Sequence, residues 1–274
     1  MKAKTKTIAV SFSKGGIGKT TSVINLGFGL VQQGYKVLMV DLDYNSYLTQ
    51  YFFGNDYDTS KTIYQIMKGN CLVEEAIMPI KFSNRKSVNY NSSSAVYDLI
   101  PCSKEFSNIS SDIIQRTRRT EFMLKDSLEA FLTECQYDFI LFDCPPSEAS
   151  LKINVFAMVD YALLVCNPTV AALNGYSIAV SEINTAIKYD NPNLQVLGIA
   201  ACDTNNTSEH LWGIEMIQEQ EDFYAFKTKI RHCSAVGLAY AKQCPVQYCR
   251  STSNAAIDYT ALTNEVIERI NKLK

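Results

Sequence analysis

A glycine-rich stretch near the beginning of the chain, residues 11–21, constrains the fold more than any other feature of the sequence. It reads S-F-S-K-G-G-I-G-K-T-T. A short apolar run typical of a strand precedes the stretch, and an apolar pattern typical of a helix follows it. Glycines allow backbone N–H groups to approach an anion without a Cβ in the way, and the N-terminus of the next helix adds partial positive charge. The stretch therefore predicts a loop that cradles phosphate groups between a strand and a helix.

The side chains of this loop suggest how it would bind a nucleotide. Lys19 is placed to reach the β- and γ-phosphates as a point charge, and the Thr20 hydroxyl is placed to bind Mg²⁺. The stretch departs from the common pattern G-x-x-x-x-G-K-[ST], because Ser13 stands at the position of the first glycine and an additional lysine, Lys14, follows it. The predicted nucleotide-binding residues are Lys14, Gly15, Gly16, Ile17, Gly18, Lys19, Thr20 and Thr21.

Along the rest of the chain, short apolar runs alternate with amphipathic helical patterns. This alternation predicts an α/β fold with a mainly parallel, twisted sheet and helices on both of its faces. The expected strands are 7–12, 36–41, 97–101, 139–143, 161–167 and 195–202, and the expected helices are 20–33, 121–134, 175–189, 208–220 and 256–273. Residues 83–95 are rich in serine and asparagine, which predicts a solvated, mobile loop.

The composition agrees with one large core. The chain has 274 residues, 47% of them hydrophobic, and no linker rich in proline, glycine or serine divides it, so we expect a single domain over residues 1–274. The formal net charge of -2 does not indicate nucleic-acid binding, so any such contact must come from a local patch. The nine cysteines form no C-x-x-C pair and are interpreted as reduced thiols. Because the sequence has no secretory segment and no long apolar run, we expect a cytoplasmic protein that does not use a membrane.

Carboxylates close two of the expected strands. Asp143 ends the apolar run 139–142 and is followed by C-P-P-S. A carboxylate in this position beside a phosphate loop favours a role in holding Mg²⁺, and the alternative is an aspartate that caps the next turn. Asp41 and Asp43 close the strand at 36–41, and their spacing puts both carboxylates on one side of an extended chain.

These residues together resemble a known family. The variant loop K-G-G-x-G-K-T is similar to the deviant Walker A loop of the ParA/MinD class of ATPases, and Y-D-F-I-L-F-D-C-P-P-S at 137–147 closely resembles the partition ATPases. Weaker matches, such as Y-D-L-I-P-C at 97–102 and P-V at 245–246, extend the resemblance over nearly the whole chain. On these motifs the chain is identified as a ParA/Soj-type partition ATPase of the short form, without an N-terminal helix-turn-helix.

The resemblance implies roles for individual residues. Lys14 would reach across an ATP-dependent homodimer to the partner's phosphates. Asp143 would be the Walker B residue that holds Mg²⁺, Asp41 would help to order the Mg²⁺ shell, and Asp43 would orient the attacking water. With Thr20 these give a metal set of Thr20, Asp41 and Asp143, and a catalytic set of Lys14, Lys19 and Asp43.

The resemblance also implies an activity and partners. We expect an ATPase that is weak without its partner, that dimerises with ATP, that binds nucleoid DNA non-specifically, and that a ParB-like protein stimulates during segregation of plasmid, chromosome or mobile-element DNA. One alternative is a MinD-like ATPase that positions cargo at a membrane or a protein assembly. In that case the C-terminal helix would lie on lipid, but its pattern suits packing on the sheet better. Another alternative is a switch that hydrolyses ATP slowly.

The sequence departs from the family pattern in two places. Y-N-S-Y at 44–47 replaces the usual P-Q-G-N after the second aspartate, which leaves the hydrolysis rate open. I-R-H-C-S-A at 230–235 replaces I-P-R-N-V-R, so the residues that contact the base and DNA are not assigned. The residues available for a basic patch are Lys227, Lys229, Arg231, Lys242 and Arg250. The cluster Arg116, Arg118 and Arg119 is interpreted as a solvated helix face, and the alternative is a contact with a phosphate backbone.

Overall fold

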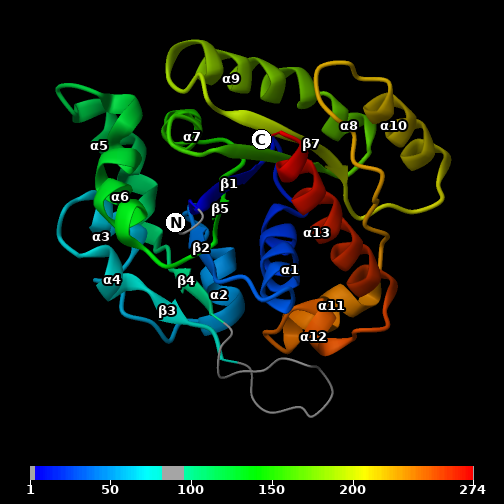
Figure 1. Cartoon of the computed structure of the whole chain (residues 1–274), viewed down its shortest axis with the longest axis horizontal. Coiled ribbons are helices and arrows are strands. Elements are labelled where there is room, and N and C mark those ends of the chain that lie inside the picture. The colour runs from blue at the N-terminus through cyan, green and yellow to red at the C-terminus, as the bar shows by residue number, and fades with distance from the viewer. Residues whose placement is uncertain (1–3, 82–95, 274) are drawn as a thin grey trace.

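A seven-stranded sheet forms the centre of the computed structural model, which describes residues 4–81 and 96–273 (Figure 1). Within these residues the strand order is β3-β4-β2-β5-β1-β6-β7. Every neighbouring pair is parallel except β3 and β4, so the predicted α/β fold with a mainly parallel sheet is confirmed. The strands are β1 (Lys6–Ser11), β2 (Val37–Asp41), β3 (Met78–Pro79), β4 (Tyr97–Ile100), β5 (Phe139–Asp143), β6 (Tyr161–Cys166) and β7 (Gln195–Ala201).

Helices cover both faces of the sheet, as predicted. One face carries α1 (Lys19–Gln32), α2 (Tyr47–Phe53), α11 (Ser234–Ala241), α12 (Val246–Cys249) and α13 (Asn254–Lys272). The other face carries α3 (Ile63–Met67), α5 (Ile109–Gln115), α6 (Met123–Glu134), α7 (Ala149–Phe156), α9 (Tyr176–Tyr189) and α10 (Ser208–Gln218). The same side also holds the short elements α4 (Val73–Ala76), η1 (Lys104–Asn108), η2 (Thr120–Phe122) and α8 (Val170–Leu173).

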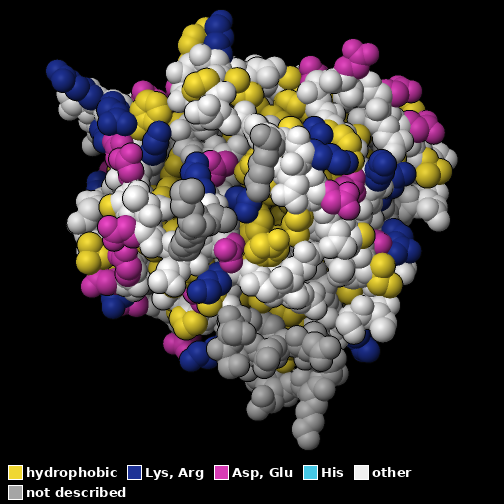
Figure 2. Space-filling model, viewed as in Figure 1, with side chains coloured by type: hydrophobic (Ala, Val, Ile, Leu, Met, Phe, Trp, Pro, Cys, Tyr) yellow, Lys and Arg dark blue, Asp and Glu magenta, His cyan; other side chains and the backbone are white. Residues whose placement is uncertain are grey.

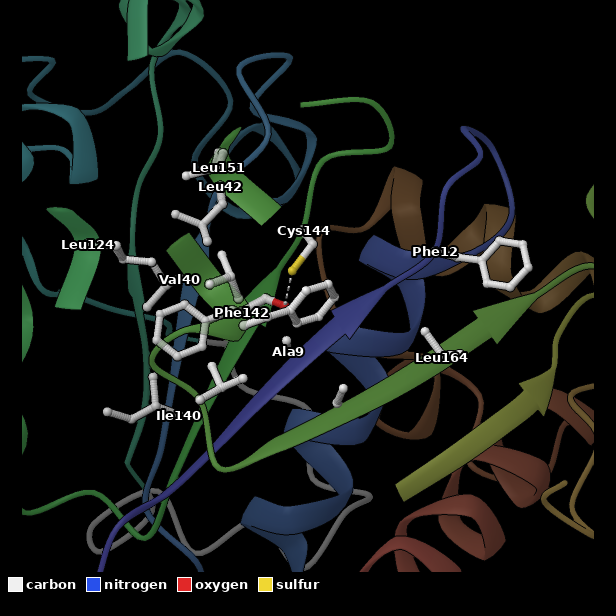
Figure 3. Close-up of a cluster of buried hydrophobic side chains, with 14 of the residues drawn as sticks. Ala9, Phe12, Val40, Leu42, Leu124, Ile140, Phe142, Cys144, Leu151 and Leu164 are labelled. Atoms are coloured by element: carbon white, nitrogen blue, oxygen red, sulfur yellow. Dashed lines mark hydrogen bonds between the residues drawn. The ribbon is translucent and has the colours of Figure 1, made fainter. Parts of the chain in front are cut away.

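The middle of each central strand is apolar, as expected for strands that are buried on both sides. Along β1, Ile8 and Val10 pack under α1 and α13, whereas Ala9 between them faces the opposite layer. Along β5, Ile140 and Phe142 point into that opposite layer, where they lie beside Val40 of β2 and Ala9 of β1 (Figure 3). This continuous burial leaves the strand ends as the places where polar side chains can reach a ligand.

Sequence periodicity located the long elements and missed the short ones. The six expected strands and five expected helices are present with ends shifted by a few residues. The edge strand β3 was missed because it has only two residues, one of them Pro79, which has no N–H to donate to a ladder. The helix α7 was missed because its start lies in a stretch rich in proline and serine. The expected loop at 83–95 lies outside the described residues.

The C-terminal helix packs against the protein, as its pattern predicted. Its apolar face is buried against α1 through Leu262, Val266 and Ile270. Among the described helices, none is both long and apolar enough to cross a lipid bilayer.

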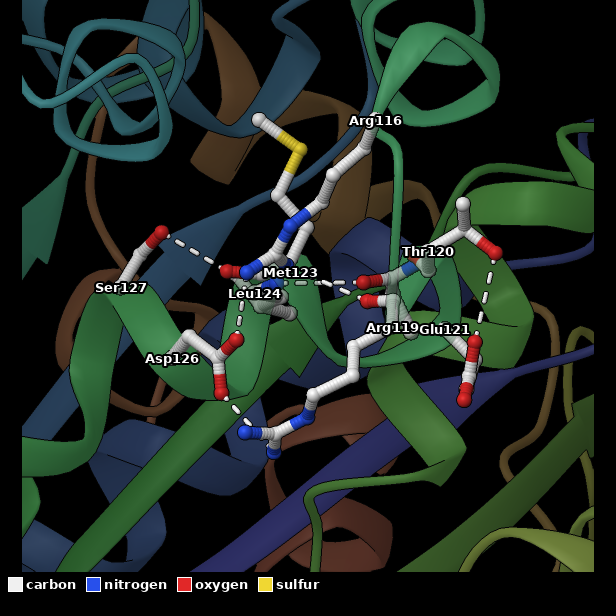
Figure 4. A network of polar contacts seen from close by, with 9 residues as sticks. Arg116, Arg119, Thr120, Glu121, Met123, Leu124, Asp126 and Ser127 are labelled. Carbon is white, nitrogen blue, oxygen red and sulfur yellow. Dashed lines mark hydrogen bonds and ion pairs between the residues drawn. The ribbon is translucent and has the colours of Figure 1, made fainter.

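The interpretation of the arginine cluster as a helix face is wrong. Arg116 and Arg119 lie at the turn between α5 and η2, and both side chains converge on Asp126 of α6 (Figure 4). The Arg116 Nη2 lies 2.6 Å from one carboxylate oxygen of Asp126, and the Arg119 Nη2 lies 3.1 Å from the other. The cluster therefore fastens this turn to α6, because a shared carboxylate can accept from both guanidinium groups.

The contact between α1 and α13 depends on a glycine. A Cβ on Gly29 would lie 2.2 Å from the Oγ1 of Thr263, whose hydroxyl is held by the carbonyl of Tyr259. We therefore expect Gly29→Ala to lower the free energy of unfolding by about 1–3 kcal/mol, even though alanine is the better helix former. Urea denaturation of the nucleotide-free protein measures this.

Gly237 in α11 is the matched control, because a Cβ there meets nothing within 4 Å. Gly237→Ala should be neutral or stabilising by up to about 1 kcal/mol. Equal stability of the Gly29→Ala variant and the native protein would contradict this account of the α1–α13 contact.

Candidate functional site

The glycine-rich loop joins β1 to α1 at the centre of the sheet. Gly16 has φ 71° and Gly18, the N-cap of α1, has φ 95°, which is the left-handed region that favours glycine. A Cβ on Gly16 would meet nothing within 4 Å, so the glycine serves the backbone conformation and not a close contact. The loop thus presents backbone N–H groups beside the N-terminus of a fourteen-residue helix, which is an arrangement suited to anions.

The sheet topology brings the predicted carboxylates to this loop. β5 lies between β1 and β2, and Asp143 pairs in register with Val10 on one side and with Asp41 on the other. All three strands are parallel, so their carboxyl ends meet at one edge of the sheet. Asp41, Asp43 and Asp143 therefore lie next to the glycine-rich loop, as the sequence indicated.

Thr20 and Asp143 form a pair that fits a magnesium ion. The Thr20 hydroxyl donates to the Oδ2 of Asp143 over 2.7 Å. The other carboxylate oxygen, Oδ1, is buried and has no hydrogen-bond partner among the described residues. Burial raises the pKa of Asp143 well above its ordinary value, and the charge of Asp41 adds to this, whereas the Thr20 hydrogen bond and Lys19 lower it. A hydroxyl oxygen beside an unsatisfied carboxylate oxygen is the kind of donor set that Mg²⁺ prefers.

Lys19 is buried at the base of the loop. Its Nζ donates to the carbonyl of Lys14 over 2.6 Å, and its side chain is close enough to Asp143 for their charges to interact. Burial lowers the pKa of Lys19, and the nearby charge of Asp143 opposes this. A buried ammonium beside a ring of backbone N–H groups is a cation for which a phosphate oxygen would be a stronger acceptor than a carbonyl.

Asp41 supports the loop that follows β2. Its Oδ2 accepts from both the backbone N–H and the hydroxyl of Thr49, over 2.9 and 2.7 Å, and its Oδ1 accepts from the N–H of Asp43. Burial raises the pKa of Asp41 to about 6. This carboxylate ties α2 to the end of β2, and its role in a metal shell stays a prediction. Thr49 was missed by sequence reasoning, because nothing in its spacing links it to Asp41.

Asp43 faces the open side of the site. It lines a cleft of about 1010 Å³ that extends from the glycine-rich loop to α11. The Oδ1 of Asp43 accepts from the backbone N–H and the side-chain amide of Asn45, both over 2.9 Å. The loop side of the cleft wall begins at Gly15 and does not include Lys14.

The far wall of the cleft comes from the segment that departs from the family pattern. Arg231 and His232 both line it, and His232, which the sequence did not mark as functional, lies with its Nδ1 2.7 Å from Asp203. The guanidinium of Arg231 donates to both oxygens of Asp258 on α13, over 2.7 and 2.9 Å. Arg231 is therefore paired with α13 while about half of its side chain stays exposed, so its place in the expected basic patch stays a prediction.

Comparisons with known proteins agree with this site. A family model described as an AAA domain matches residues 5–196. The sporulation initiation inhibitor protein Soj of Bacillus subtilis is 28% identical over 264 residues, which are 95% of this chain and 98% of Soj. The chromosome partitioning protein ParA of Caulobacter vibrioides is 27% identical over 71% of this chain and 68% of its own length.

Solved structures share the fold. A plasmid partition protein of Borrelia burgdorferi bound to AMPPNP superposes with a TM-score of 0.75 at 22% identity, over 98% of this chain and 99% of the other. Cobyrinic acid a,c-diamide synthase of Mycobacterium smegmatis, bound to an ATP analog and magnesium, gives a TM-score of 0.80 at 22% identity, over 98% and 97% of the two chains. The apo McdA of Cyanthece gives 0.81 at 18% identity, over 96% and 99%.

The family match spans most of the chain and includes the glycine-rich loop, Asp41 and Asp43 at the end of β2, and Asp143. This chain therefore belongs to that AAA-domain family, as a P-loop ATPase of the ParA/MinD type.

Proposed function

We propose that this protein is a partition-type ATPase that dimerises with ATP, binds DNA non-specifically and is stimulated by a ParB-like partner to segregate DNA. The observation that carries the proposal is the pairing of Thr20 with Asp143, whose second oxygen is buried and unsatisfied beside Lys19 and the glycine-rich loop. The similarity to Soj and ParA, both named for roles in sporulation or chromosome partitioning, supports the cellular process.

Different described residues have different roles in the proposed hydrolysis of ATP. The backbone N–H groups of residues 15–21 and the Nζ of Lys19 bind the phosphates, for which Lys19 leaves the carbonyl of Lys14. Thr20 and Asp143 hold Mg²⁺, which when bound neutralises charge on the β- and γ-phosphates. Asp43, on the open side of the cleft, orients the attacking water. The side chain of Lys14 contacts the phosphates bound by the partner subunit in the dimer.

The surroundings of Asp43 support slow turnover in the absence of a partner. One of its carboxylate oxygens already accepts two hydrogen bonds from Asn45, in the segment that replaces the family's usual residues. An oxygen that already accepts two hydrogen bonds has less capacity left to accept one from the attacking water. We infer that a partner which rearranges residues 44–47 would free Asp43 and accelerate hydrolysis.

DNA binding in this proposal is local and electrostatic. On the face drawn in Figure 2, lysine and arginine side chains are mixed with aspartate and glutamate, so the described residues on this face offer no broad basic surface. The candidates are Lys227, Lys229, Lys242, Arg250 and the half-exposed Arg231, whose guanidinium is paired with Asp258. Contacts of this kind neutralise DNA phosphates and carry no sequence preference. The nucleoid in the cytoplasm is the location that such binding implies.

Substitution should distinguish the roles of the two loop lysines, Lys14 and Lys19. Lys19→Ala is expected to weaken ATP binding at least about tenfold, because it removes a buried cation at the phosphates. Lys14→Ala is expected to keep the affinity of the monomer within about twofold but to remain monomeric with ATP and Mg²⁺. Titration with a fluorescent ATP analog and light scattering measure the two properties. A Lys14→Ala variant that dimerises normally would exclude its role in trans.

The buried charge of Asp143 should appear as a pH effect on stability. Because its pKa is raised in the folded state, the protonated carboxyl of Asp143 adds to the stability at low pH. That contribution is lost as the pH rises and the group ionises. We therefore expect nucleotide-free Asp143→Asn to unfold at a higher temperature than the native protein near about pH 8, with the difference shrinking towards acid pH.

The same variant tests the metal site. Its ATP affinity in Mg²⁺ should fall about tenfold, while its affinity in EDTA should match that of the native protein. A stability offset that does not change with pH, or an unchanged effect of Mg²⁺ on ATP binding, would contradict the assignment of Asp143.

The proposed binding to DNA should be sensitive to salt. With ATP and Mg²⁺ the native protein should shift duplex DNA of unrelated sequences equally, and the binding should weaken steeply between about 50 and 200 mM salt. Lys242→Glu should weaken the shift, whereas Glu74→Gln, in the short helix α4 on the opposite face of the sheet, is the control. Failure of the ATP-bound native protein to shift DNA at low salt would count against DNA binding without affecting the ATPase assignment.

A further inference from the structure

A buried cation beside the glycine-rich loop has no part in the mechanism above. Lys152 lies on α7, and its side chain is only 4% exposed. Its Nζ lies 2.5 Å from the Oε1 of Glu182 on α9 and donates to the Oγ of Ser13 over 3.1 Å. The Ser13 hydroxyl in turn donates to the Oε2 of Glu182 over 2.9 Å. The three side chains therefore close a ring of hydrogen bonds between the loop, α7 and α9.

Stability alone is a poor explanation for this ring. Burying the ammonium of Lys152 costs free energy that its attraction to the partly exposed carboxylate of Glu182 only partly returns, and well-packed apolar side chains in such places are often at least as stable. A buried pair can instead fix one arrangement of the elements that carry it. Here those elements are α7, which follows the loop after Asp143, and α9, so the pair links both helices to the glycine-rich loop.

A second contact places Ser13 against the start of α9. A Cβ on Gly175, the N-cap of α9, would lie 3.2 Å from the ring of Phe12 and 3.6 Å from the carbonyl oxygen of Ser13. The backbone of Ser13 therefore lies close to α9 at the same point where its hydroxyl reaches Glu182. The main chain of Ser13 therefore lies beside the start of α9, and its side chain is hydrogen-bonded to Glu182 of α9.

Ser13 immediately precedes Lys14, whose side chain is proposed to contact the phosphates bound by the partner subunit. In the described structure the backbone of Lys14 is held from both sides. On one side Ser13 is held by Lys152 and Glu182, and on the other the carbonyl of Lys14 accepts from Lys19. When Lys19 turns to a phosphate, that second contact is given up, and the contact through Ser13 remains.

We propose that Lys152 and Glu182 are positioning residues that act through the Ser13 hydroxyl to fix the direction in which Lys14 leaves the loop, and so control ATP-dependent dimerisation. The inference rests on the proposed function, because it assigns a purpose to the geometry of Lys14. It differs from a simple clamp between α7 and α9, since a clamp would not need the hydroxyl of Ser13.

Ser13→Ala is the decisive variant, because it removes the hydroxyl and leaves the ion pair between Lys152 and Glu182 in place. With ATP and Mg²⁺ we expect its apparent dimer Kd to rise about tenfold, while the affinity of the monomer for ADP changes less than about twofold. Ser13→Thr keeps the hydroxyl and should dimerise like the native protein. Glu182→Gln should weaken dimerisation as Ser13→Ala does, and should also lower the unfolding temperature.

Analytical ultracentrifugation and ADP titration of the full chain separate the outcomes. If the native protein dimerises and Ser13→Ala matches it, the inference is overturned and the pair is only a clamp. Equal losses of ADP affinity and dimerisation in Ser13→Ala would also overturn it, because the whole loop would then be disturbed. A native protein that binds ATP and Mg²⁺ but stays monomeric would overturn the proposed function, and the inference with it.

Discussion

The site is organised around negative charge that the sheet buries and does not fully neutralise. Asp41 and Asp143 are register partners on neighbouring parallel strands, and both are almost completely buried. Burial raises the pKa of each, and each feels the charge of other carboxylates nearby. Asp41 is compensated by Thr49, whereas Asp143 has Thr20 on one oxygen and nothing described on the other. A cation that binds at the unsatisfied oxygen of Asp143 would therefore make a favourable interaction.

This arrangement follows from the topology more than from any one residue. Parallel strands that are buried on both faces leave only their carboxyl ends for polar chemistry, and the order β2-β5-β1 places three such ends side by side. The glycine-rich loop at the end of β1 then faces the carboxylates of β2 and β5. Phosphate groups and their metal are the ligands that satisfy a ring of N–H donors and a carboxylate at once.

The sequence predicted the parts of the site whose chemistry is local. The glycine-rich loop, Asp143 and the pair Asp41 and Asp43 were found because each lies at the end of an apolar run. The strands were found for the same reason. What could not be predicted depends on contacts between distant segments, such as Thr49 with Asp41, for which no pattern along the chain gives a signal.

The partners of Ser13 are the clearest case of this limit. Lys152 and Glu182 are separated from Ser13 by 139 and 169 positions in the chain, and either one alone resembles an ordinary charged residue on a helix. Only the packing of α7 against α9 beside the glycine-rich loop brings the three together. Helical periodicity would place a lysine such as Lys152 at the surface, and its burial is visible only in the folded chain.

The departures from the family pattern also gain a physical meaning in the structure. At the position where the family carries a proline, Arg231 donates to both oxygens of Asp258 and so joins the wall of the cleft to α13. A proline stiffens a chain through its own ring, whereas an arginine can fix the same segment by a bidentate ion pair to a neighbouring helix. The substitution therefore need not loosen the cleft, because the ion pair holds the same segment to α13.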